Sequence, residues 1–455
     1  MPETNILALN EIKNNIFKVH TVLKYIVEPR KNALGEITVP GDKSISHRSI
    51  MLAAIAEGTS KVSGFLEGED CLATMQAFQQ MGVEIKRLGQ GELSIQGVGR
   101  NGLAQPNKIL DLGNSGTSMR LLTGLLAGQS IHTELVGDSS LMKRPMRRVC
   151  DPLSQMGANV STQESGTPPV VIKPVDHLDA ITYELPVASA QVKSAILLAG
   201  LYARGTTTVV ESKITRDHTE RMLGSFGYPI KVVNQGRVSV DGGLPLQATN
   251  IQVPADISSA AFFIVAACIA EQGEITIHNV GMNPTRTGVL EILQQMNADI
   301  EVHHQAMMGG EPTASITARS SLLKGIDVPT HLVPSAIDEF PILCVAAACA
   351  QGKTRVSNAE ELRVKESDRI SQVAQGLATL NIEVEEFADG LTITGGEFSG
   401  GEIASGHDHR VAMSFAVASL RANAAIEISD CQNVATSFPG FVEMANSIGL
   451  NINVV

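Results

Sequence analysis

The stretch VPADISSAAFFIVAACIAEQG, residues 253–273, limits the architectures open to this chain. Pro254 favours an extended entry, Asp256 can cap the start of a helix, and Gly273 can follow its end. The body of this helix, AAFFIVAACIA, has no wide polar face, so other structure must surround it. Its eleven residues are too few to cross a bilayer as a helix, so we expect it in a protein core.

The same design recurs along the chain, as a short extended segment that runs into a helix rich in small residues. The second copy below lacks the Pro, and the last keeps only the helix. The other copies are VPGDKSISHRSIMLAAIAEG (39–58), LDLGNSGTSMRLLTGLLAGQ (110–129), LPVASAQVKSAILLAGLYARG (185–205), VPSAIDEFPILCVAAACAQG (333–352) and SGHDHRVAMSFAVASLRANA (405–424).

A short phrase, an apolar residue usually followed by Gly or Asn and then by a β-branched residue, recurs six times. It reads MGVEI (81–85), MGANV (156–160), FGYPI (226–230), MNADI (296–300), LNIEV (380–384) and IGLNI (448–452). Successive copies are 75, 70, 70, 84 and 68 residues apart. Strand-like and amphipathic stretches complete each repeat, so the sequence predicts six β-α-β-α-β-β units.

Six units cannot each bury two helices alone, so neighbouring units must share a core. We expect an α/β protein of two lobes, each with three units and buried helices. The Gly- and Pro-rich loop 241–250 precedes the fourth unit and marks the expected boundary between lobes. From its position alone, the strand around 35–39 could join either lobe.

Composition disfavours several classes of function. The 455 residues include 35 Lys and Arg against 47 Asp and Glu, a formal net charge of −12, which disfavours a non-specific grip on nucleic acid. The 6 Cys lie in apolar stretches without a C-x-x-C pair, so we expect reduced core residues in a cytoplasmic protein and no metal or cofactor. The first residues lack the apolar run of a signal peptide.

Polar residues stand at the starts of the apolar helices. One such group is best explained as a helix cap with a solvated cation, but recurrence at equivalent positions favours anion binding. These residues are Lys43, Ser44 and Arg48; Asn114, Ser115, Gly116, Thr117 and Arg120; and Ser189, Gln191 and Lys193.

Further cations occupy the connecting segments, and together they predict a positive cleft for a strongly anionic small ligand. Arg147 and Arg148 are interpreted as covering a helix surface. Arg144, Arg369 and Arg410 are better candidates for bidentate recognition of carboxylate or phosphate. The other cations of these segments are Lys143, Arg216 and Lys365.

Two acids stand among these cations. Asp338 is expected at the start of an apolar helix, where it could be an N-cap, and Glu366 lies between Lys365 and Arg369. Both could be ion-pair partners only. If they share a cleft, they could instead move protons at a carbon and at an oxygen.

Eight motifs in unbroken order together resemble the EPSP synthase (3-phosphoshikimate 1-carboxyvinyltransferase) family, over about residues 25–455. They are GDKSISHR, LGNSGTSMR, GDSSLMKRPM, SAQVKSAILLAG, IDEFPILCVAAA, LRVKESDR, DHRVAM and ATSFPGF. The resemblance implies an enolpyruvyl transferase-like inside-out barrel with the active site between two lobes. It places one lobe at 39–250, the other at 25–38 plus 251–455, and leaves 1–24 as an extension of unknown role.

The implied reaction transfers the enolpyruvyl group of phosphoenolpyruvate to the 5-hydroxyl of shikimate 3-phosphate and releases phosphate. In the family's pattern, Asp338, Glu366 and Lys43 are catalytic. The implied shikimate 3-phosphate ligands are Lys43, Ser44, Arg48, Ser189, Gln191, Arg216, Asp338 and Lys365. Those implied for phosphoenolpyruvate are Lys43, Gly116, Arg144, Gln191, Arg369 and Arg410. No metal or cofactor, nucleic acid or membrane is expected, and the protein should be a cytoplasmic monomer.

The sequence departs from the best-known members of the family at Thr436, where they have Lys. GDKS, SAQVK, RDHTE and NPTR instead resemble the glyphosate-tolerant bacterial subclass, although that subclass often has Ala where this chain has Gly116. Two alternatives stay open. The related UDP-N-acetylglucosamine enolpyruvyl transferase uses a loop cysteine that LMKRP lacks here, and a repeat-built nucleic-acid clamp or RNA-end-processing protein needs a cationic inner surface.

Overall fold

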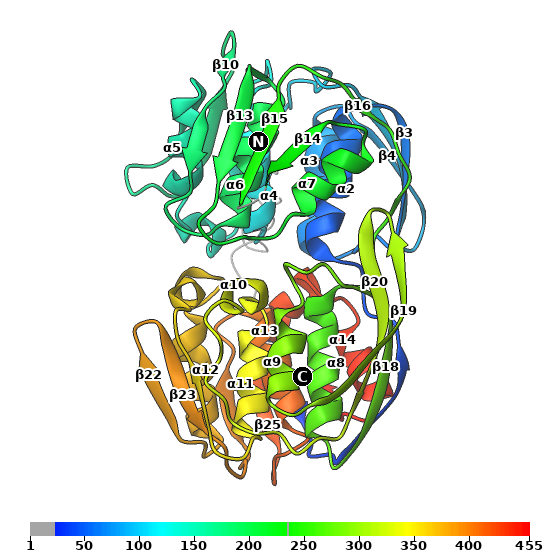
Figure 1. Ribbon diagram of the computed structural model, residues 1–455, viewed down its shortest axis with the longest axis vertical. Helices are drawn as coiled ribbons and strands as arrows, with labels where there is room; N and C mark the ends of the chain where they lie inside the picture. The colour runs from blue at the N-terminus through cyan, green and yellow to red at the C-terminus, as the bar shows by residue number, and fades with distance from the viewer. Residues whose placement is uncertain (1–22, 234–235) are drawn as a thin grey trace, which may run out of the picture.

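A computed structural model describes residues 23–233 and 236–455, and arranges them as two lobes stacked along the long axis of the molecule (Figure 1). The extension expected at 1–24 lies outside the described residues except for Leu23 and Lys24. Two separate clusters of buried apolar side chains form the cores. The first lobe has its core within residues 45–253, and the core of the second lobe draws on 25–39 and 255–452.

The strands of the first lobe form three main sheets and one short pair, β10 (Leu178–Asp179) with β12 (Ala203–Arg204). The first sheet holds β3 (Ala56–Ser63), β4 (Glu84–Gly89), β5 (Glu92–Val98), β16 (Leu246–Gln247) and β17 (Ile251–Gln252). The second holds β6 (Leu110–Asp111), β7 (Thr133–Val136), β8 (Asn159–Ser161) and β9 (Val170–Lys173). The third holds β11 (Thr182–Glu184), β13 (Thr206–Val210), β14 (Ile230–Val233) and β15 (Arg237–Asp241).

The second lobe has three sheets of the same kind. One holds β2 (Asn32–Ile37), β18 (Gln272–Gly281), β19 (Asp299–Met308) and β20 (Glu311–Arg319). The next holds β21 (Lys353–Val356), β22 (Val384–Phe387) and β23 (Gly390–Thr394). The last holds β1 (Tyr25–Val27), β24 (Gly401–Ala404), β25 (Ile426–Ser429) and β26 (Ile452–Val454).

The sheets repeat one topology, which confirms the expected fold class of repeated β-α-β-α-β-β units. A parallel pair such as β6 and β7 is followed by two antiparallel strands, as in β9 and β8. Two units exchange their first strand. The strand β2 precedes the first helix of the first lobe but pairs with β18 of the second lobe. The strands β16 and β17 precede the first helix of the second lobe but pair with β3 of the first lobe. The chain therefore crosses between the lobes twice, after β2 and after β17.

The first helix of each unit is buried, as its lack of a polar face predicts. These helices are α2 (Lys43–Ile55), α4 (Gly116–Ala127), α6 (Ala190–Gly200), α8 (Ile257–Ile269), α11 (Phe340–Ala348) and α13 (His409–Ala418). The second helices are α3 (Glu69–Gln80), α5 (Arg147–Gln155), α7 (His218–Ser225), α9 (Gly288–Gln295), α12 (Arg369–Thr379) and α14 (Phe441–Ser447). The short α10 (Val333–Ala336) precedes α11. No helix of the described chain is long and apolar enough to cross a membrane.

The recurring phrase marks the end of each second helix. Its second residue has a positive φ in all six copies: Gly82 (86°), Gly157 (86°), Gly227 (73°), Asn297 (70°), Asn381 (67°) and Gly449 (118°). A left-handed residue at this place turns the chain out of the helix, and Gly or Asn adopts that conformation at least cost. The phrase therefore repeats because each unit makes the same turn.

The two chain crossings lie side by side. Gly41 and Ala255 form an antiparallel bridge, and the Asp42 N–H donates to the Pro254 carbonyl over 2.8 Å. Arg286, from the second lobe, donates to Asp42 over 3.0 Å and to Asp256 over 3.3 Å. Because these two aspartates cap α2 and α8, the crossing fixes one helix start from each lobe beside the other.

Candidate active site

A cavity of about 360 Å³ lies between the lobes, at the starts of the buried helices. Of the residues predicted from sequence, those on its wall are Lys43, Ser44, Gly116, Arg144, Ser189, Gln191, Arg216, Asp338, Lys365, Glu366, Arg369 and Arg410. Thr117 and Arg120, predicted at the start of α4, also line it, whereas the predicted residues Arg48, Asn114, Ser115, Lys143 and Lys193 do not. The polar residues at the starts of the apolar helices therefore meet in one cavity.

Lys43 stands at the first turn of α2 and touches both lobes. Its ammonium group pairs with the Asp70 carboxylate in the first lobe and donates to the Ser437 hydroxyl of the second over 2.7 Å. Burial raises the pKa of Asp70 above its ordinary value, although Lys43 opposes the shift. Lys43 can thus contact a ligand held by either lobe.

Gly116 opens α4 and provides a flat floor for two guanidinium groups. A Cβ atom at this position would lie 2.8 Å from Nη1 of Arg144 and 3.0 Å from Nη1 of Arg120. Arg144 also donates to the Asn114 amide oxygen over 2.8 Å. A side chain at 116 would therefore force both guanidinium groups to shift from these positions.

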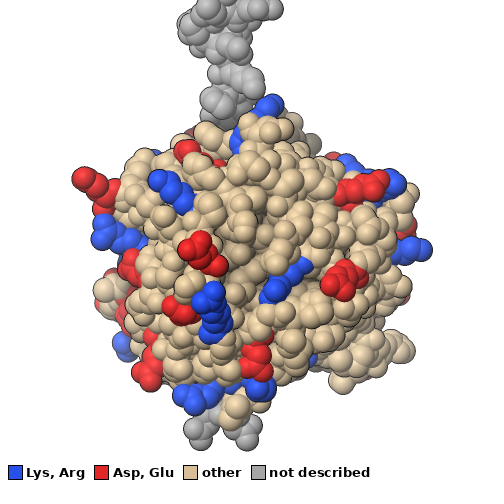
Figure 2. All heavy atoms as spheres, turned by 90° about the horizontal axis from the view of Figure 1, so that it is seen from above, with Lys and Arg blue, Asp and Glu red and all other residues tan. Residues whose placement is uncertain are grey.

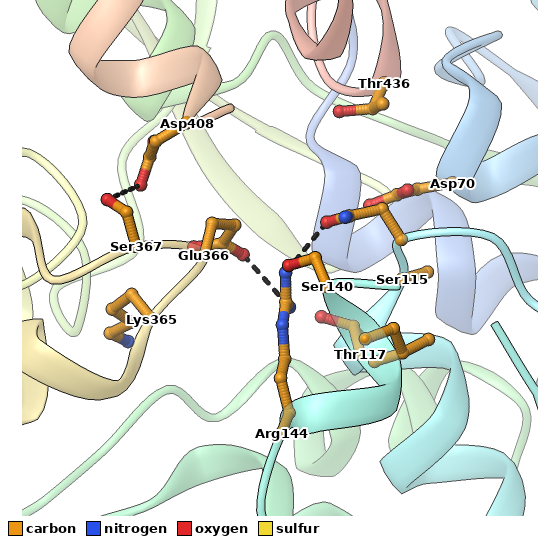
Figure 3. A network of polar contacts seen from close by, with 12 residues as sticks. Asp70, Ser115, Thr117, Ser140, Arg144, Lys365, Glu366, Ser367, Asp408 and Thr436 are labelled. Carbon is orange, nitrogen blue, oxygen red and sulfur yellow. Dashed lines mark hydrogen bonds and ion pairs between the residues drawn. The ribbon is translucent and has the colours of Figure 1, made fainter. Parts of the chain in front are cut away.

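Arg144 reaches across the cavity to Glu366, with Nη1 3.4 Å from the carboxylate (Figure 3). Glu366 also accepts from Arg369 over 2.7 Å. Burial alone would raise the pKa of Glu366, but Arg369 and Arg144 outweigh it and hold the pKa well below the ordinary value. Glu366 is therefore an ionised carboxylate between two arginines.

Asp338 lies in the short turn between α10 and α11, so its interpretation as an N-cap is wrong. Glu339 takes the cap position instead, without a side-chain cap bond. The Asp338 carboxylate pairs with Arg216 of the first lobe and lies 3.4 Å from Lys365. Burial would raise its pKa, but Arg216 and Lys365 hold it well below the ordinary value.

Arg369 and Arg410 complete the wall of the second lobe. Arg369 begins α12, is buried, and donates from Nε to Asp408 over 2.8 Å. Arg410, in the first turn of α13, donates to the Asp338 carbonyl over 3.1 Å. Asp408 also accepts from the backbone N–H of Arg410 and caps α13, so one buried carboxylate orients the Arg369 side chain and fixes the helix start that carries Arg410.

The structure places Arg48 behind the cavity wall, not on it. Its guanidinium group donates to Thr219 over 2.7 Å, to Ser194 over 2.9 Å and to the Ser44 carbonyl over 3.0 Å. The sequence shows that Arg48 lies one turn beyond Ser44 but not which neighbours cover that face of α2. In this conformation it supports the helix start that carries Lys43 and Ser44.

Arg148 is the main functional candidate that the sequence reading missed. Its interpretation as a helix cover is wrong, because it lines the cavity and lies 3.1 Å from Glu361 of the second lobe. The spacing of four residues from Arg144 was the available indication. Other lining residues without a predicted role include Asp70, Lys213, Asn358 and His409.

Arg120 adds a third cation beside Arg144 and Arg148. It donates to the Gln191 amide oxygen over 2.6 Å, and the Gln191 amide group donates to Thr117 over 2.9 Å. Burial, followed by Arg148 and Arg144, lowers the pKa of Arg120 to about 9. Thr436, by contrast, is buried away from the cavity and donates to the Asn433 carbonyl.

The cations gather in the cavity and not on the outer end of the first lobe. Viewed down the long axis, that end carries Lys, Arg, Asp and Glu side chains singly among uncharged residues (Figure 2). In the part of the chain that the structure describes, no group of three or more His, Cys, Asp or Glu is placed to hold a metal ion. Arginine and lysine side chains are therefore the groups available to bind anions in the cavity.

Two lobes of repeated units around a cavity of this kind define the enolpyruvyl transferase-like fold. The family model described as EPSP synthase (3-phosphoshikimate 1-carboxyvinyltransferase) matches residues 27–444, so the chain belongs to this family.

Similar proteins agree with this assignment. A 3-phosphoshikimate 1-carboxyvinyltransferase of Hydrogenovibrio crunogenus is 55% identical over 439 residues, which cover 95% of this chain and 99% of that one. One of Methylococcus capsulatus is 59% identical over 420 residues, or 92% and 96% of the two chains. The solved EPSP synthase of Acinetobacter baumannii is 54% identical, with a TM-score of 0.86, and covers 95% of this chain and 100% of its own.

Proposed function

We propose that this enzyme transfers the enolpyruvyl group of phosphoenolpyruvate to the 5-hydroxyl of shikimate 3-phosphate and releases phosphate. The step belongs to the shikimate pathway of aromatic amino-acid biosynthesis. One observation carries the proposal: the cavity collects cations from both lobes around two partly buried carboxylates, Asp338 and Glu366. Both substrates carry a phosphate and a carboxylate, so they match this excess of positive charge.

We assign shikimate 3-phosphate to the part of the cavity near α2, α6 and the loop that carries Arg216. Arg216 and Lys365 are suited to its anionic groups, and Ser44, Ser189 and Gln191 to its phosphate oxygens and hydroxyls. Asp338 pairs with Arg216 in the empty site, so it would lie next to a ligand that Arg216 binds.

Phosphoenolpyruvate would occupy the part of the cavity nearer Arg144 and Glu366. Arg144, Arg369 and Arg410 present three guanidinium groups there. Gly116 leaves the space in which a carboxylate or phosphate can approach Arg144, while Lys43 and Gln191 can reach both substrates. These groups supply the charge stabilisation that a metal ion would otherwise provide.

In the mechanism that we propose, Asp338 accepts the proton of the 5-hydroxyl. Glu366 takes up a proton from solvent when phosphoenolpyruvate binds to its arginines, and delivers that proton to the methylene carbon of phosphoenolpyruvate. The new C–O bond forms at the adjacent carbon, which gives a tetrahedral adduct. The Glu366 carboxylate then takes a proton back from the methyl group while the adduct expels phosphate, and Lys43 stabilises this leaving group. Closure of the lobes about the paired crossings at Gly41 and Ala255 would exclude water from these steps.

The test is a phosphate-release assay with phosphoenolpyruvate and either shikimate 3-phosphate or UDP-N-acetylglucosamine. We expect phosphate release when the acceptor is shikimate 3-phosphate and not when it is UDP-N-acetylglucosamine. The enzyme that acts on the amino sugar nucleotide uses a loop cysteine, and no cysteine lines the described cavity here. Release only with the amino sugar nucleotide would overturn the proposal. Salt-sensitive binding of nucleic acid without either activity would favour the third class of function.

Three further expectations belong to this proposal. We place the enzyme in the cytoplasm. We also expect a monomer, and sedimentation at increasing protein concentration would test this oligomeric state. We also propose glyphosate tolerance, from the likeness of GDKS, SAQVK, RDHTE and NPTR to the tolerant subclass. Competition against phosphoenolpyruvate by a low concentration of glyphosate would contradict it.

A further inference from the structure

A buried lysine lies behind the cavity wall, in the otherwise apolar helix α6. Lys193 is only 1% exposed and pairs with two carboxylates, Glu211 at 2.8 Å and Glu220 at 2.7 Å. Burial would lower the pKa of Lys193, but Glu220 and Glu211 raise it above its ordinary value. None of these three residues lines the cavity, so the mechanism above does not use them directly.

The cluster holds a loop that does line the cavity. Residues 211–217 join β13 to α7, and Ser212, Lys213, Thr215 and Arg216 all reach the wall. All three backbone and side-chain polar groups of Thr215 meet the cluster. Its carbonyl accepts from Lys193 over 3.2 Å, its N–H donates to Glu211 over 3.2 Å, and its hydroxyl donates to the same carboxylate.

No apolar anchor replaces these bonds within the loop. Ile214, its one large apolar residue, is 65% exposed. At the far end, Asp217 accepts from Asn283 of the second lobe over 2.7 Å. Arg216 therefore sits between a polar anchor within the first lobe and a contact with the second.

Stability alone does not explain a lysine at this position. Replacing a buried ion pair by apolar residues of similar size is often neutral or stabilising. The neighbours of Lys193 on α6 are buried apolar residues such as Val192, Ala195 and Ile196, and a methionine would suit the same surroundings. A buried cation that engages the loop through two partners has a role that an apolar residue cannot fill.

We infer that Lys193 is a positioning residue, which fixes the loop 211–217 through Glu211 and Thr215 and thereby holds Arg216 on the cavity wall. The inference rests on the proposed function, since Arg216 is assigned to shikimate 3-phosphate. Lys193 itself touches no substrate. Its effect should therefore appear in the binding of shikimate 3-phosphate and depend on the presence of Arg216.

The test uses the balanced variant Lys193→Met/Glu220→Gln, because Lys193→Met alone leaves two buried carboxylates without a cation. By calorimetry, we expect the Kd for shikimate 3-phosphate to rise about 10- to 100-fold, the effect of one lost charge-assisted hydrogen bond. The KM for phosphoenolpyruvate should stay within about threefold. Adding the balanced pair of changes to Arg216→Ala should weaken binding by less than about threefold, because their effect requires the arginine.

The matched control is Ile95→Ala, a buried position in β5 of the same lobe. It should lower the melting temperature without changing the Kd. Amide hydrogen exchange at Thr215, which needs no substrate, should become faster in the balanced variant and not in the control.

Two results would overturn the inference: an additive loss with Arg216→Ala, or unchanged Thr215 exchange with an unchanged Kd. If wild-type protein binds no shikimate 3-phosphate, the proposed function fails instead. In that case, Thr215 exchange alone still tests whether Lys193 fixes the loop.

Discussion

The two walls of the cavity carry opposite charges where they face each other. In three ion pairs that span the cavity, the first lobe contributes the cation and the second lobe contributes the carboxylate, whereas at the chain crossing Arg286 of the second lobe pairs with Asp42 of the first. The three pairs are Arg144 with Glu366 at 3.4 Å, Arg148 with Glu361 at 3.1 Å, and Arg216 with Asp338. The second lobe also has cations, but Lys365 and Arg369 lie beside its own carboxylates.

This difference shows how an empty site and an occupied site can use the same residues. The carboxylates of the second lobe occupy positions that substrate phosphates and carboxylates would take on the first lobe. A bound anion would release Asp338 and Glu366 from their arginines while the lobes stay attracted to the ligand. If substrates bind as proposed, the ion pairs across the cavity are contacts that they must replace.

The largest effect is expected when one of the two carboxylates loses its charge. We expect Asp338→Asn and Glu366→Gln each to lower kcat by about 100- to 10,000-fold, the usual contribution of a general acid or base. Substrate dissociation constants should change less than about tenfold, because the cations remain. Phosphate release and calorimetry measure the two effects, and unchanged turnover in either variant would refute that residue's role.

Removal of one cation from the opposite wall should act mainly on binding. Arg144→Met should raise the KM for phosphoenolpyruvate by about 10- to 100-fold, because one bidentate contact is lost. The matched control is Arg147→Met, since Arg147 lies in the same segment and donates to the Glu164 carbonyl on the surface. Equal effects of the two variants would contradict the assignment of Arg144.

The protonation of Glu366 should change when phosphoenolpyruvate replaces it as the partner of Arg144 and Arg369. Arg369 and Arg144 hold the pKa of Glu366 below its ordinary 4.5, and an anion bound to them should raise it. Binding of phosphoenolpyruvate should therefore take up a fraction of a proton, and more as the pH falls from about 7 to 5. Calorimetry in buffers of different ionisation enthalpy measures this uptake, and Glu366→Gln should abolish it.

The lowered pKa of Glu366 also predicts how the stability of the folded protein changes with pH. A carboxylate with a lowered folded-state pKa stabilises the empty protein above its ordinary pKa, and this contribution is lost as the pH falls through the lowered value. The melting temperature of the empty enzyme should thus fall in acid below about pH 4.5, and less steeply in Glu366→Gln. A melting temperature that rises in this window would contradict the ion-pair geometry.

The smallest effect is expected at the mouth of the cavity. Arg148 and Glu361 are 26% and 30% exposed, so solvent screens their attraction. A double-mutant cycle of Arg148→Ala and Glu361→Ala should give a coupling of about 0.2 to 1 kcal/mol in urea unfolding, and less at high salt. A coupling that is larger than about 2 kcal/mol and insensitive to salt would mean that this pair holds the lobes together.

Local features of the chain made much of this protein predictable. The repeats, the apolar first helices and the terminal turns each depend on a few adjacent residues, as at Gly82 and Asn297. The family's motifs carried the candidate residues, and the structure brings Lys43, Arg144 and Glu366 into one cavity. The sequence predicted Arg48 on the cavity wall and Arg148 on a helix surface, and the structure shows the reverse. Their positions depend on which helix surfaces remain open after the helices pack.

The linear order of residues thus specifies where each turn, cap and buried helix begins, since these depend on interactions within one or two helical turns. Which side chains meet does not follow from that order. Arg144 and Glu366 are 222 positions apart, and β2 pairs in the lobe opposite to the helix that follows it. Partners so distant are selected by packing of complete units, so the charges of the two walls become complementary only once both lobes have folded.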